Sequence, residues 1–272
     1  MCRRRLKGSF SVDIKILVAA HKEYSFPDDG VYLPVHVGKN GGDGFGIPGD
    51  DTGDNISAKN PNYCELTALY WAWKNLSCDY IGLCHYRRYF AHRPFSRSAE
   101  HKRGSVFKRC DYERLLRAYD VVLPKKRMYY IETVRSQYEH AHFKRDLDAA
   151  ERIVKELHPD CADAFDAVMG RRGLHLYNMF VMGKARFDDY CEWLFPILSA
   201  LEKRIDIASY DRTQARVFGF LGERLFNVWI ERQGFKAFEA HVVNLERTDW
   251  PKKISAFLKR KFIARGCEVA AK

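Results

Sequence analysis

Two adjacent arginines, Arg87 and Arg88, directly follow an apolar stretch that ends in His85 and Tyr86. Burying a guanidinium without a partner is costly, so both must meet either acidic side chains of the chain or an anionic ligand. The planar fork of arginine binds two oxygens of one phosphate at once. The pattern therefore favours a phosphate site, and a structural arginine–carboxylate network is the alternative.

A second basic pair follows the first apolar run of the chain. Ala20 ends this run, and His21 and Lys22 come next. In a parallel sheet the carboxyl ends of the strands meet at one edge, which is where ligands bind. We expect a hydrogen-bond donor and a cation for an anionic ligand at this edge, with a solvated lysine as the alternative.

Polar side chains are dense between residues 53 and 65, immediately before an apolar helical pattern. Asp54, Asn55, Ser57, Asn60 and Glu65 lie in this segment. Capping of a helix explains one or two such residues, at about 1 kcal/mol each. A helix N-terminus that carries several polar groups can also bind phosphate or sugar hydroxyls, and we favour this second interpretation.

Two further groups of polar residues occur later in the chain. Tyr177 and Asn178 begin an apolar run, and Glu223, Arg224 and Asn227 fall within little more than one helical turn. Glu223 and Asn227 are four residues apart and share a helix face. A single glutamate on a helix is usually solvated, so the spacing alone assigns it no role.

Several cofactor classes lose support. The glycine-rich segment 41–46 lacks both the Gly-Lys-[Ser/Thr] ending of a Walker loop and the tight strand–helix join of a dinucleotide fingerprint. No His-Glu-x-x-His motif and no pair of closely spaced cysteines occurs, and no Asp-x-Asp follows residues 80–83. We therefore assign no metal ligands, although a Mn²⁺ or Mg²⁺ requirement stays open.

Alternating apolar runs and helical patterns must position these residues. Strands are predicted at 14–20, 80–86, 119–123, 177–182 and 235–243. Helices are predicted at 63–75, from an N-cap at Asp111, at 132–157, at 187–204 with a bend or break at Pro196, and at 214–233. This order predicts an α/β fold with a mostly parallel sheet flanked by helices. We expect one domain at 13–248 between basic tails at 1–12 and 249–272.

Composition excludes some classes of protein. The chain has 272 residues, 46% of them hydrophobic, which is too many for a disordered chain. Its longest aliphatic run, 16–20, is far too short to span a bilayer. The eight cysteines are scattered and the basic N-terminus lacks an apolar signal region, so we expect reduced thiols and a cytosolic protein. The net charge of +11 indicates an anionic partner.

The tail 249–272 has an imperfect amphipathic pattern. Ile254, Phe257, Leu258 and Phe262 share one helical face, and basic residues lie elsewhere. Such a helix could rest on an anionic inner membrane leaflet, and a solvated tail is the equal alternative.

Three stretches together resemble a known family. They are the polar segment 54–60, the aromatic helical pattern 63–75, and the segment 82–90, which contains His-Tyr-Arg-Arg-Tyr-Phe at 85–90. Residues 19–22, 177–180 and 223–227 fit the same pattern. The combination is similar to a bacterial family of capsular and exopolysaccharide glycosyltransferases, formerly catalogued as a domain of unknown function, some members of which are described as galactofuranosyltransferases.

The resemblance implies a GT-A-like fold, a nucleotide-sugar donor, with UDP as the expected nucleotide, and a lipid-linked glycan acceptor. It implies catalytic roles for Glu223, Arg87, Arg88 and Glu65. The donor would be bound by Ala20, His21, Lys22, Asp54, Asn55, Ser57, Asn60, His85 and Tyr86, and the acceptor by Tyr177, Asn178 and Arg224.

The chain departs from the metal-dependent enzymes of this fold at one point. Where those carry Asp-x-Asp, this chain has His85, Tyr86 and Arg87. We therefore expect Arg87, Arg88 and Lys22 to neutralise the departing diphosphate, and turnover to survive EDTA.

Two other functions remain as alternatives. A basic chain with 15 Tyr and 18 Phe could bind nucleic acid by stacking. It could also be a non-catalytic sugar-binding subunit of another transferase. A nucleic-acid-binding protein would bind oligonucleotides and not UDP-sugars. A non-catalytic subunit would bind the donor but release no UDP.

Overall fold

The computed structural model describes residues 12–93 and 98–246. Strand β1 (Ile14–Ala20) lies inside a seven-stranded sheet. Its side chains alternate between two cores: Leu17 and Ala19 face one, and Ile16 and Val18 face the other. The other strands of this sheet are β2 (Tyr32–His36), β3 (Tyr80–His85), β4 (Arg88–Ala91), β5 (Val121–Pro124), β8 (Phe180–Gly183) and β9 (Ala237–Asn244).

The strand order is β2-β1-β3-β4-β9-β5-β8, and β8 also pairs with β3, so that five strands are paired in a ring. A short antiparallel pair, β6 (Arg127–Met128) with β7 (Gly173–Leu174), lies outside this sheet.

The prediction of a mostly parallel sheet is confirmed only in part, because the sheet is mixed. The pairs β1–β2, β1–β3 and β5–β9 are parallel, whereas β3–β4, β3–β8, β4–β9 and β5–β8 are antiparallel. Continuous apolar runs indicate burial on both faces of a sheet but not strand direction. The chain turns back between His85 and Arg88, which are paired, so Arg87 lies in the turn.

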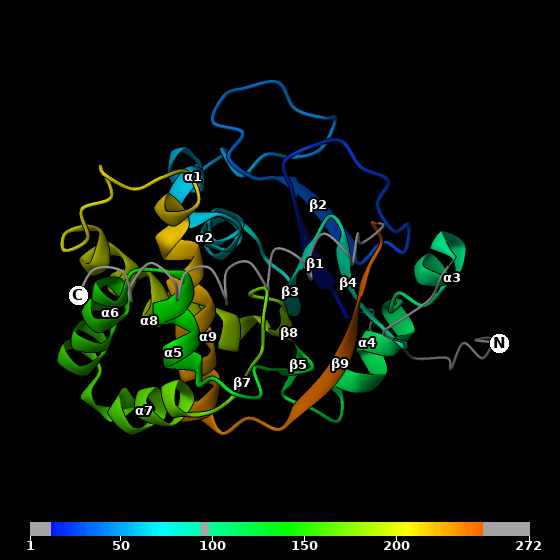
Figure 1. Cartoon of the computed structure of the whole chain (residues 1–272). Coiled ribbons are helices and arrows are strands. Elements are labelled where there is room, and N and C mark those ends of the chain that lie inside the picture. The colour runs from blue at the N-terminus through cyan, green and yellow to red at the C-terminus, as the bar shows by residue number, and fades with distance from the viewer. Residues whose placement is uncertain (1–11, 94–97, 247–272) are drawn as a thin grey trace.

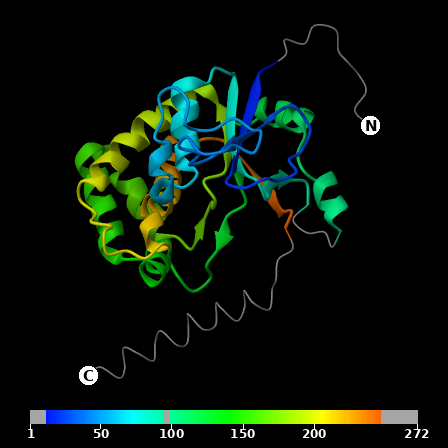
Figure 2. The same ribbon diagram turned by 90° about the horizontal axis from the view of Figure 1, so that it is seen from above.

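Helices cover the sheet on two sides (Figures 1 and 2). One side carries α2 (Leu66–Asn75), α5 (Val134–Ala141), α6 (Lys144–Leu157), α7 (Ala162–Gly170), α8 (Lys184–Glu202) and α9 (Val217–Gln233). The other side carries α3 (Ala99–Gly104) and α4 (Arg109–Leu116). Short elements complete the chain: η1 (Ser57–Lys59), α1 (Asn60–Tyr63), η2 (Pro159–Cys161) and η3 (Gln214–Arg216).

Three helix predictions need correction. The pattern at 132–157 is two helices, because His142 is extended, with a φ of −140°. Its ring stacks on Phe220 at 4.1 Å, a tertiary contact that local periodicity cannot reveal. Asp111 is not the N-cap of α4: it lies inside the helix and accepts from the Lys108 backbone at 2.9 Å. Helix α8 is continuous through Pro196, which is exposed, so water can bond the carbonyl that loses its partner.

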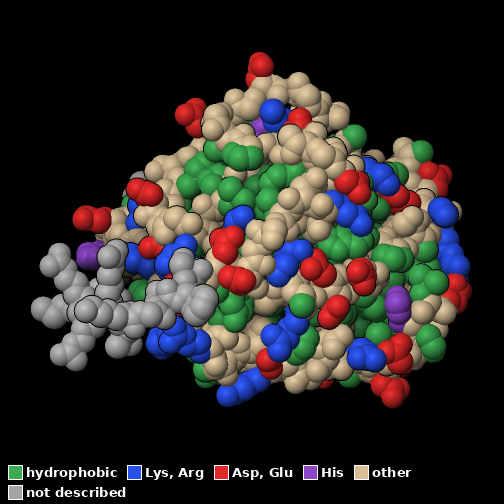
Figure 3. All heavy atoms as spheres, turned by 180° about the vertical axis from the view of Figure 1, so that it is seen from behind, with side chains coloured by type: hydrophobic (Ala, Val, Ile, Leu, Met, Phe, Trp, Pro, Cys, Tyr) green, Lys and Arg blue, Asp and Glu red, His purple; other side chains and the backbone are tan. Residues whose placement is uncertain are grey.

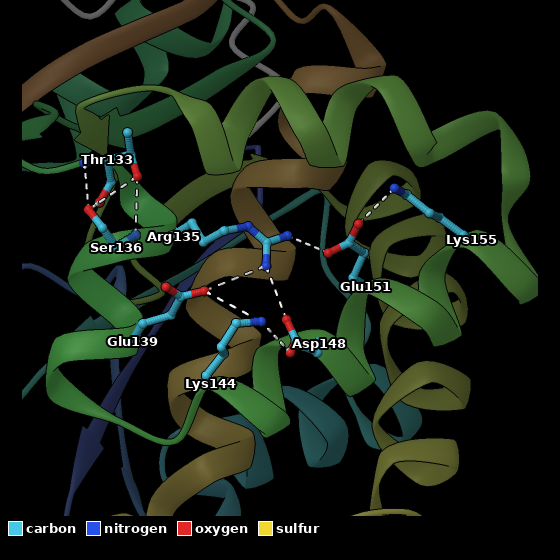
Figure 4. A network of polar contacts seen from close by, with 8 residues as sticks. All are labelled: Thr133, Arg135, Ser136, Glu139, Lys144, Asp148, Glu151 and Lys155. Carbon is cyan, nitrogen blue, oxygen red and sulfur yellow. Dashed lines mark hydrogen bonds and ion pairs between the residues drawn. The ribbon is translucent and has the colours of Figure 1, made fainter.

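Charged residues join α5 to α6 in a surface network (Figure 4). Arg135 contacts Glu139, Asp148 and Glu151. Lys144 adds a bond to Asp148 at 2.6 Å, and Lys155 bonds Glu151 at 2.8 Å. Every charge of this network therefore has an opposite charge beside it.

The back of the molecule carries both signs of charge. In Figure 3, Lys and Arg side chains are interspersed with Asp and Glu over the coloured surface. The coloured part of this face therefore shows no continuous basic stripe of the kind that binds nucleic acid.

Within residues 12–93 and 98–246, no helix is long and apolar enough to cross a membrane. The predicted amphipathic tail at 249–272 and nearly all of the predicted basic tail at 1–12 lie outside the described residues.

Candidate functional site

Strands β1 and β3 run parallel, with Ala19 paired to His85, so the residues after each strand leave the sheet at the same edge. Here the buried ring of Tyr86 contacts three predicted site residues. The His21 ring lies edge-on at 5.0 Å, Lys22 Nζ lies 5.0 Å from the ring centre, and Arg87 Cζ lies 5.4 Å from it. His21, Lys22 and Arg87 therefore lie together at this edge, and their role in binding an anionic ligand stays a prediction.

Glu246 bridges the first two cations. Its carboxylate accepts from Lys22 at 3.0 Å and from Arg87 at 3.1 Å. The bond from Lys22 has the largest effect, and together with the bond from Arg87 it holds the pKa of Glu246 below its usual range. One carboxylate is therefore shared by two cations. The buried Nε of Arg87 has no hydrogen-bond partner within the described residues.

Arg88 begins β4 and differs from Arg87. Its guanidinium lies 4.6 Å from the ring centre of Tyr177. No described residue forms a hydrogen bond or ion pair with it. Burial lowers the pKa of Arg88, although the negative charge of Glu65 acts against this. Arg88 is therefore a half-buried cation beside an aromatic ring, without the structural carboxylate that the alternative interpretation requires.

A strained dipeptide lies at the centre of the site. Tyr177 and Asn178 have φ values of +76° and +52°, in the left-handed region that costs about 1–3 kcal/mol per residue. Three side chains hold this backbone: Tyr177 N donates to Glu223, the carbonyl of Tyr177 bonds His85 at 2.7 Å, and the Asn178 amide donates to Glu65 at 2.9 Å. The residues expected to begin a strand thus precede it, because β8 begins at Phe180.

Glu223 lies inside this cluster, on α9. Its side chain is 16% exposed, and its second oxygen accepts from Arg224 at 2.9 Å. Burial raises the pKa of Glu223, against the opposing effects of Arg224 and the Tyr177 N–H. A carboxyl group with a raised pKa, next to several cations, suits proton transfer.

Arg224 points inward. It donates to the carbonyl of Phe220 at 3.1 Å and to Gln137 at 2.8 Å, and its side chain is only 5% exposed. Its Nε is buried without a hydrogen-bond partner among the described residues. These bonds tie α9 to α5, and the acceptor-binding role expected for Arg224 stays a prediction.

The polar segment 54–60 folds around a buried aspartate that the sequence interpretation missed. Asp50 accepts from Ser57 and Thr67, both at 2.5 Å, and from the Gly38 backbone at 3.0 Å. Asn60 donates to the Cys64 carbonyl at 2.8 Å. These groups stabilise the loop after β2, one strand further along the same edge from β1.

The first residues of this segment are also bonded locally. Asn55 accepts from the backbone of Ser57 at 3.1 Å and donates to the carbonyl of Gly53 at 2.9 Å. Asp54 accepts from Tyr70 at 3.2 Å. No bond joins them to the arginine pair within the described residues, and their role in donor binding stays a prediction. The same holds for Ala20, whose carbonyl accepts from Val37 at 2.9 Å.

Arg216, just before α9, is a site residue that the sequence did not reveal. Its Nε contacts Cys64 Sγ at 3.1 Å, and its side chain is exposed. The pKa of His21 is lowered by burial, then by the charges of Lys22, Arg87 and Arg216. Arg216 therefore adds its charge to the edge formed by β1 and β3, although it lies far away in the sequence.

The described residues offer no cluster of side chains suited to a divalent metal ion. No group of three His, Cys, Asp or Glu side chains within the described ranges could hold one. At the end of β3 stand His85 and Arg87, and His85 is bonded to a backbone carbonyl. We derive no chemical step through a metal.

The profile of the domain of unknown function DUF4422 matches residues 15–234. The chain belongs to this family. No curated protein sequence matches this DUF4422 chain significantly.

One solved structure is similar to the DUF4422 chain: that of WbbM, described as a bifunctional glycosyltransferase in its apo form. The two share 35% sequence identity and superpose with a TM-score of 0.79. The match covers 86% of this chain and 46% of the WbbM chain, so the DUF4422 chain matches less than half the length of that protein.

Proposed function

We propose that this chain is a glycosyltransferase that moves a hexose from a nucleotide-diphosphate sugar, with UDP as the nucleotide, to a glycan acceptor. The single observation that carries the proposal is the position of three cations at one sheet edge: Lys22 and Arg87 contact Tyr86, and Arg88 contacts Tyr177, whose backbone N–H donates to the buried acid Glu223. The 35% identity to a glycosyltransferase supports it independently.

The cations would stabilise the leaving group. As the bond from the anomeric carbon to the diphosphate oxygen breaks, its electron pair moves onto UDP and adds negative charge. Fixed cations that need no reorganisation stabilise such a charge effectively. Arg88 is the residue best suited to this role, because no described side chain competes for it. The positive charges of Arg87 and Lys22 would be shared between the diphosphate and Glu246.

Glu223 is the proposed general base. In an inverting transfer the acceptor hydroxyl attacks the anomeric carbon and passes its proton to a carboxylate. Each oxygen of Glu223 accepts one bond and keeps a lone pair for this proton. Glu65, held by Asn178, is the second candidate. Tyr177 and Asn178 lie between the two acids and would contact the acceptor.

The acceptor class rests on the family resemblance. We propose a lipid-linked glycan of capsule, exopolysaccharide or O-antigen synthesis, and galactose or galactofuranose as the sugar. A cavity of about 240 Å³ next to Tyr177, lined also by Lys125, Arg127 and His241, is large enough for one sugar unit.

The experiment is a thermal-shift screen of the chain against nucleotide sugars, with Mn²⁺ and with EDTA, followed by an assay of UDP release. A donor at 100 times its dissociation constant stabilises the fold by about 2.7 kcal/mol. We expect a shift with a UDP-sugar that persists in EDTA, and UDP release. Shifts with oligonucleotides alone would favour a nucleic-acid-binding protein, and donor binding without UDP release a non-catalytic subunit.

A further inference from the structure

The segment 125–131, between β5 and α5, exposes an unusual set of side chains. Met128, Tyr130 and Ile131 are 48%, 78% and 68% exposed. The other large hydrophobic side chains exposed in the described part of the chain, Phe45, Phe143 and Leu157, are scattered along the sequence. Three apolar side chains within four residues form an apolar patch, and such patches mark contact surfaces.

Basic side chains lie directly beside this patch. Lys125, Lys126 and Arg127 are all exposed. None of the three forms an ion pair with a described residue, whereas the nearby Glu132 bonds His140 at 2.8 Å. Glu239, 41% exposed, is the other acid close by and lies 3.8 Å from His175. The surface of 125–131 is therefore positive as well as apolar.

The backbone holds the patch in an outward position. Arg127 pairs with Leu174 across β6 and β7, and Tyr129 N donates to the Arg172 carbonyl at 2.8 Å. A tight turn follows, in which Ile131 N donates to the Tyr129 carbonyl at 2.7 Å and Tyr130 has a φ of +59°. Arg172 donates to the Tyr130 carbonyl at 3.1 Å. The three apolar side chains are thus presented by a hydrogen-bonded turn.

We propose that segment 125–131 docks the protein on an anionic phospholipid surface. Met128, Tyr130 and Ile131 enter the boundary between headgroups and acyl chains, where tyrosine is favoured by its apolar ring and polar tip. Lys125, Lys126 and Arg127 remain at the phosphate level, where each cation strengthens binding to anionic lipid. This segment is distinct in sequence from the tail at 249–272, and the proposal goes beyond the transferase activity.

Docking by this segment would turn the site towards the lipid. Tyr129 lies behind the patch, and the charges of Arg224 and Glu223 act on its hydroxyl group. The cavity lined by Lys125, Arg127 and Tyr177 lies between the patch and the site. A lipid-linked acceptor would then reach the site without leaving the bilayer, a step that rests on the proposed function.

The test is co-sedimentation of the full chain with vesicles of phosphatidylcholine alone or mixed with phosphatidylglycerol. Because this assay measures binding and not turnover, its result is independent of the transferase proposal. The variant Met128→Ser/Tyr130→Ser/Ile131→Ser should bind the mixed vesicles at least about tenfold more weakly. The matched control Phe45→Ser/Phe143→Ser/Leu157→Ser removes as many exposed apolar side chains and should bind as the unsubstituted chain does.

A second variant covers failure of the first to fold. Lys125→Glu/Lys126→Glu/Arg127→Glu changes exposed charges only and should lower binding to the mixed vesicles about 100-fold. The proposal is overturned if the unsubstituted chain binds no vesicle, as expected for a surface that contacts a protein, or if both triple variants bind as tightly as it does.

Discussion

Arg135 and Arg88 are two arginines with opposite surroundings. Arg135, on α5, contacts three carboxylates and joins two helices (Figure 4). Arg88, at the sheet edge, contacts a tyrosine ring and no carboxylate of the described chain. Arg87 is intermediate, because it shares one acid with Lys22. The protein supplies carboxylate partners to Arg135, whereas the charge of Arg88 has no such partner among the described residues and, on the proposed function, faces the diphosphate. Substitutions in the two regions should therefore affect different quantities.

The largest effect is expected at Glu223. Glu223→Gln keeps an acceptor for the Tyr177 N–H but cannot take a proton, so turnover should fall about 10²–10⁴-fold. The matched control is Glu139→Gln in the Arg135 network, which should keep full turnover. Steady-state rates of UDP release measure both. Near-normal turnover in Glu223→Gln would remove it as the base and leave Glu65.

The pH dependence sharpens this assignment. Burial raises the pKa of Glu223, and the base works only when deprotonated. Activity should therefore be full above the raised pKa and decline as the pH falls through it, at a higher pH than an exposed glutamate would give. If the fall in rate at low pH persists in Glu223→Gln, another group is responsible for it.

Arg88→Ala should give the next largest effect. Loss of a charged hydrogen bond to the diphosphate costs about 1.5–3 kcal/mol, or roughly 10- to 150-fold in donor affinity. Because Arg88 has no structural carboxylate in the described chain, the melting temperature should not fall. Arg88→Lys should restore only part of the affinity, since lysine lacks the planar fork. Calorimetric titration with UDP measures the affinity, and a large loss of stability in Arg88→Ala would contradict the comparison.

Arg135→Ala should lower the stability of the fold instead of the affinity for UDP. Exposed pairs contribute up to about 1 kcal/mol each, and a loss of ~1 kcal/mol lowers the melting temperature by about 2–4 °C in a domain of this size. Affinity for UDP should be unchanged. Weaker UDP binding with an unchanged melting temperature would remove the distinction between the two arginines.

The smallest effect is expected at Glu246. Glu246→Gln removes the acid shared by Lys22 and Arg87 and should raise the affinity for UDP by up to about fivefold, the equivalent of one exposed ion pair. Asp160→Asn is a matched control, because it also neutralises an exposed acid, and Asp160 pairs with Arg232 and not with either of these two cations. A lower affinity in Glu246→Gln would show that Glu246 positions the two cations.

Local patterns revealed part of the fold. Strand β1 was predicted with its observed bounds, since six of its seven residues are apolar and only Lys15 interrupts them. Strand β2 was missed because Pro34 and His36 interrupt its pattern, and β4 because only the turn at Tyr86 and Arg87 separates it from β3. Strand direction depends on partners that no local pattern specifies.

The same limit applies to the site. The arginine pair and the basic pair after β1 stood out by residue type and position, whereas Glu223 and Glu65 were assigned roles only through the family resemblance. Glu246 was not recognisable, because its contact with Arg87 joins residues 159 positions apart. Asp50 was hidden in a glycine-rich loop, although its bonds to Ser57 and Thr67 explain why that polar segment is ordered.

Strand β9 has a practical consequence for anyone who prepares this protein. The family match ends at residue 234, whereas β9 spans Ala237–Asn244 and pairs with both β4 and β5. A gene fragment cut at the family boundary would lose the strand that joins these two, as well as the only acid that Lys22 and Arg87 contact among the described residues. Expression trials should therefore keep every residue through Glu246.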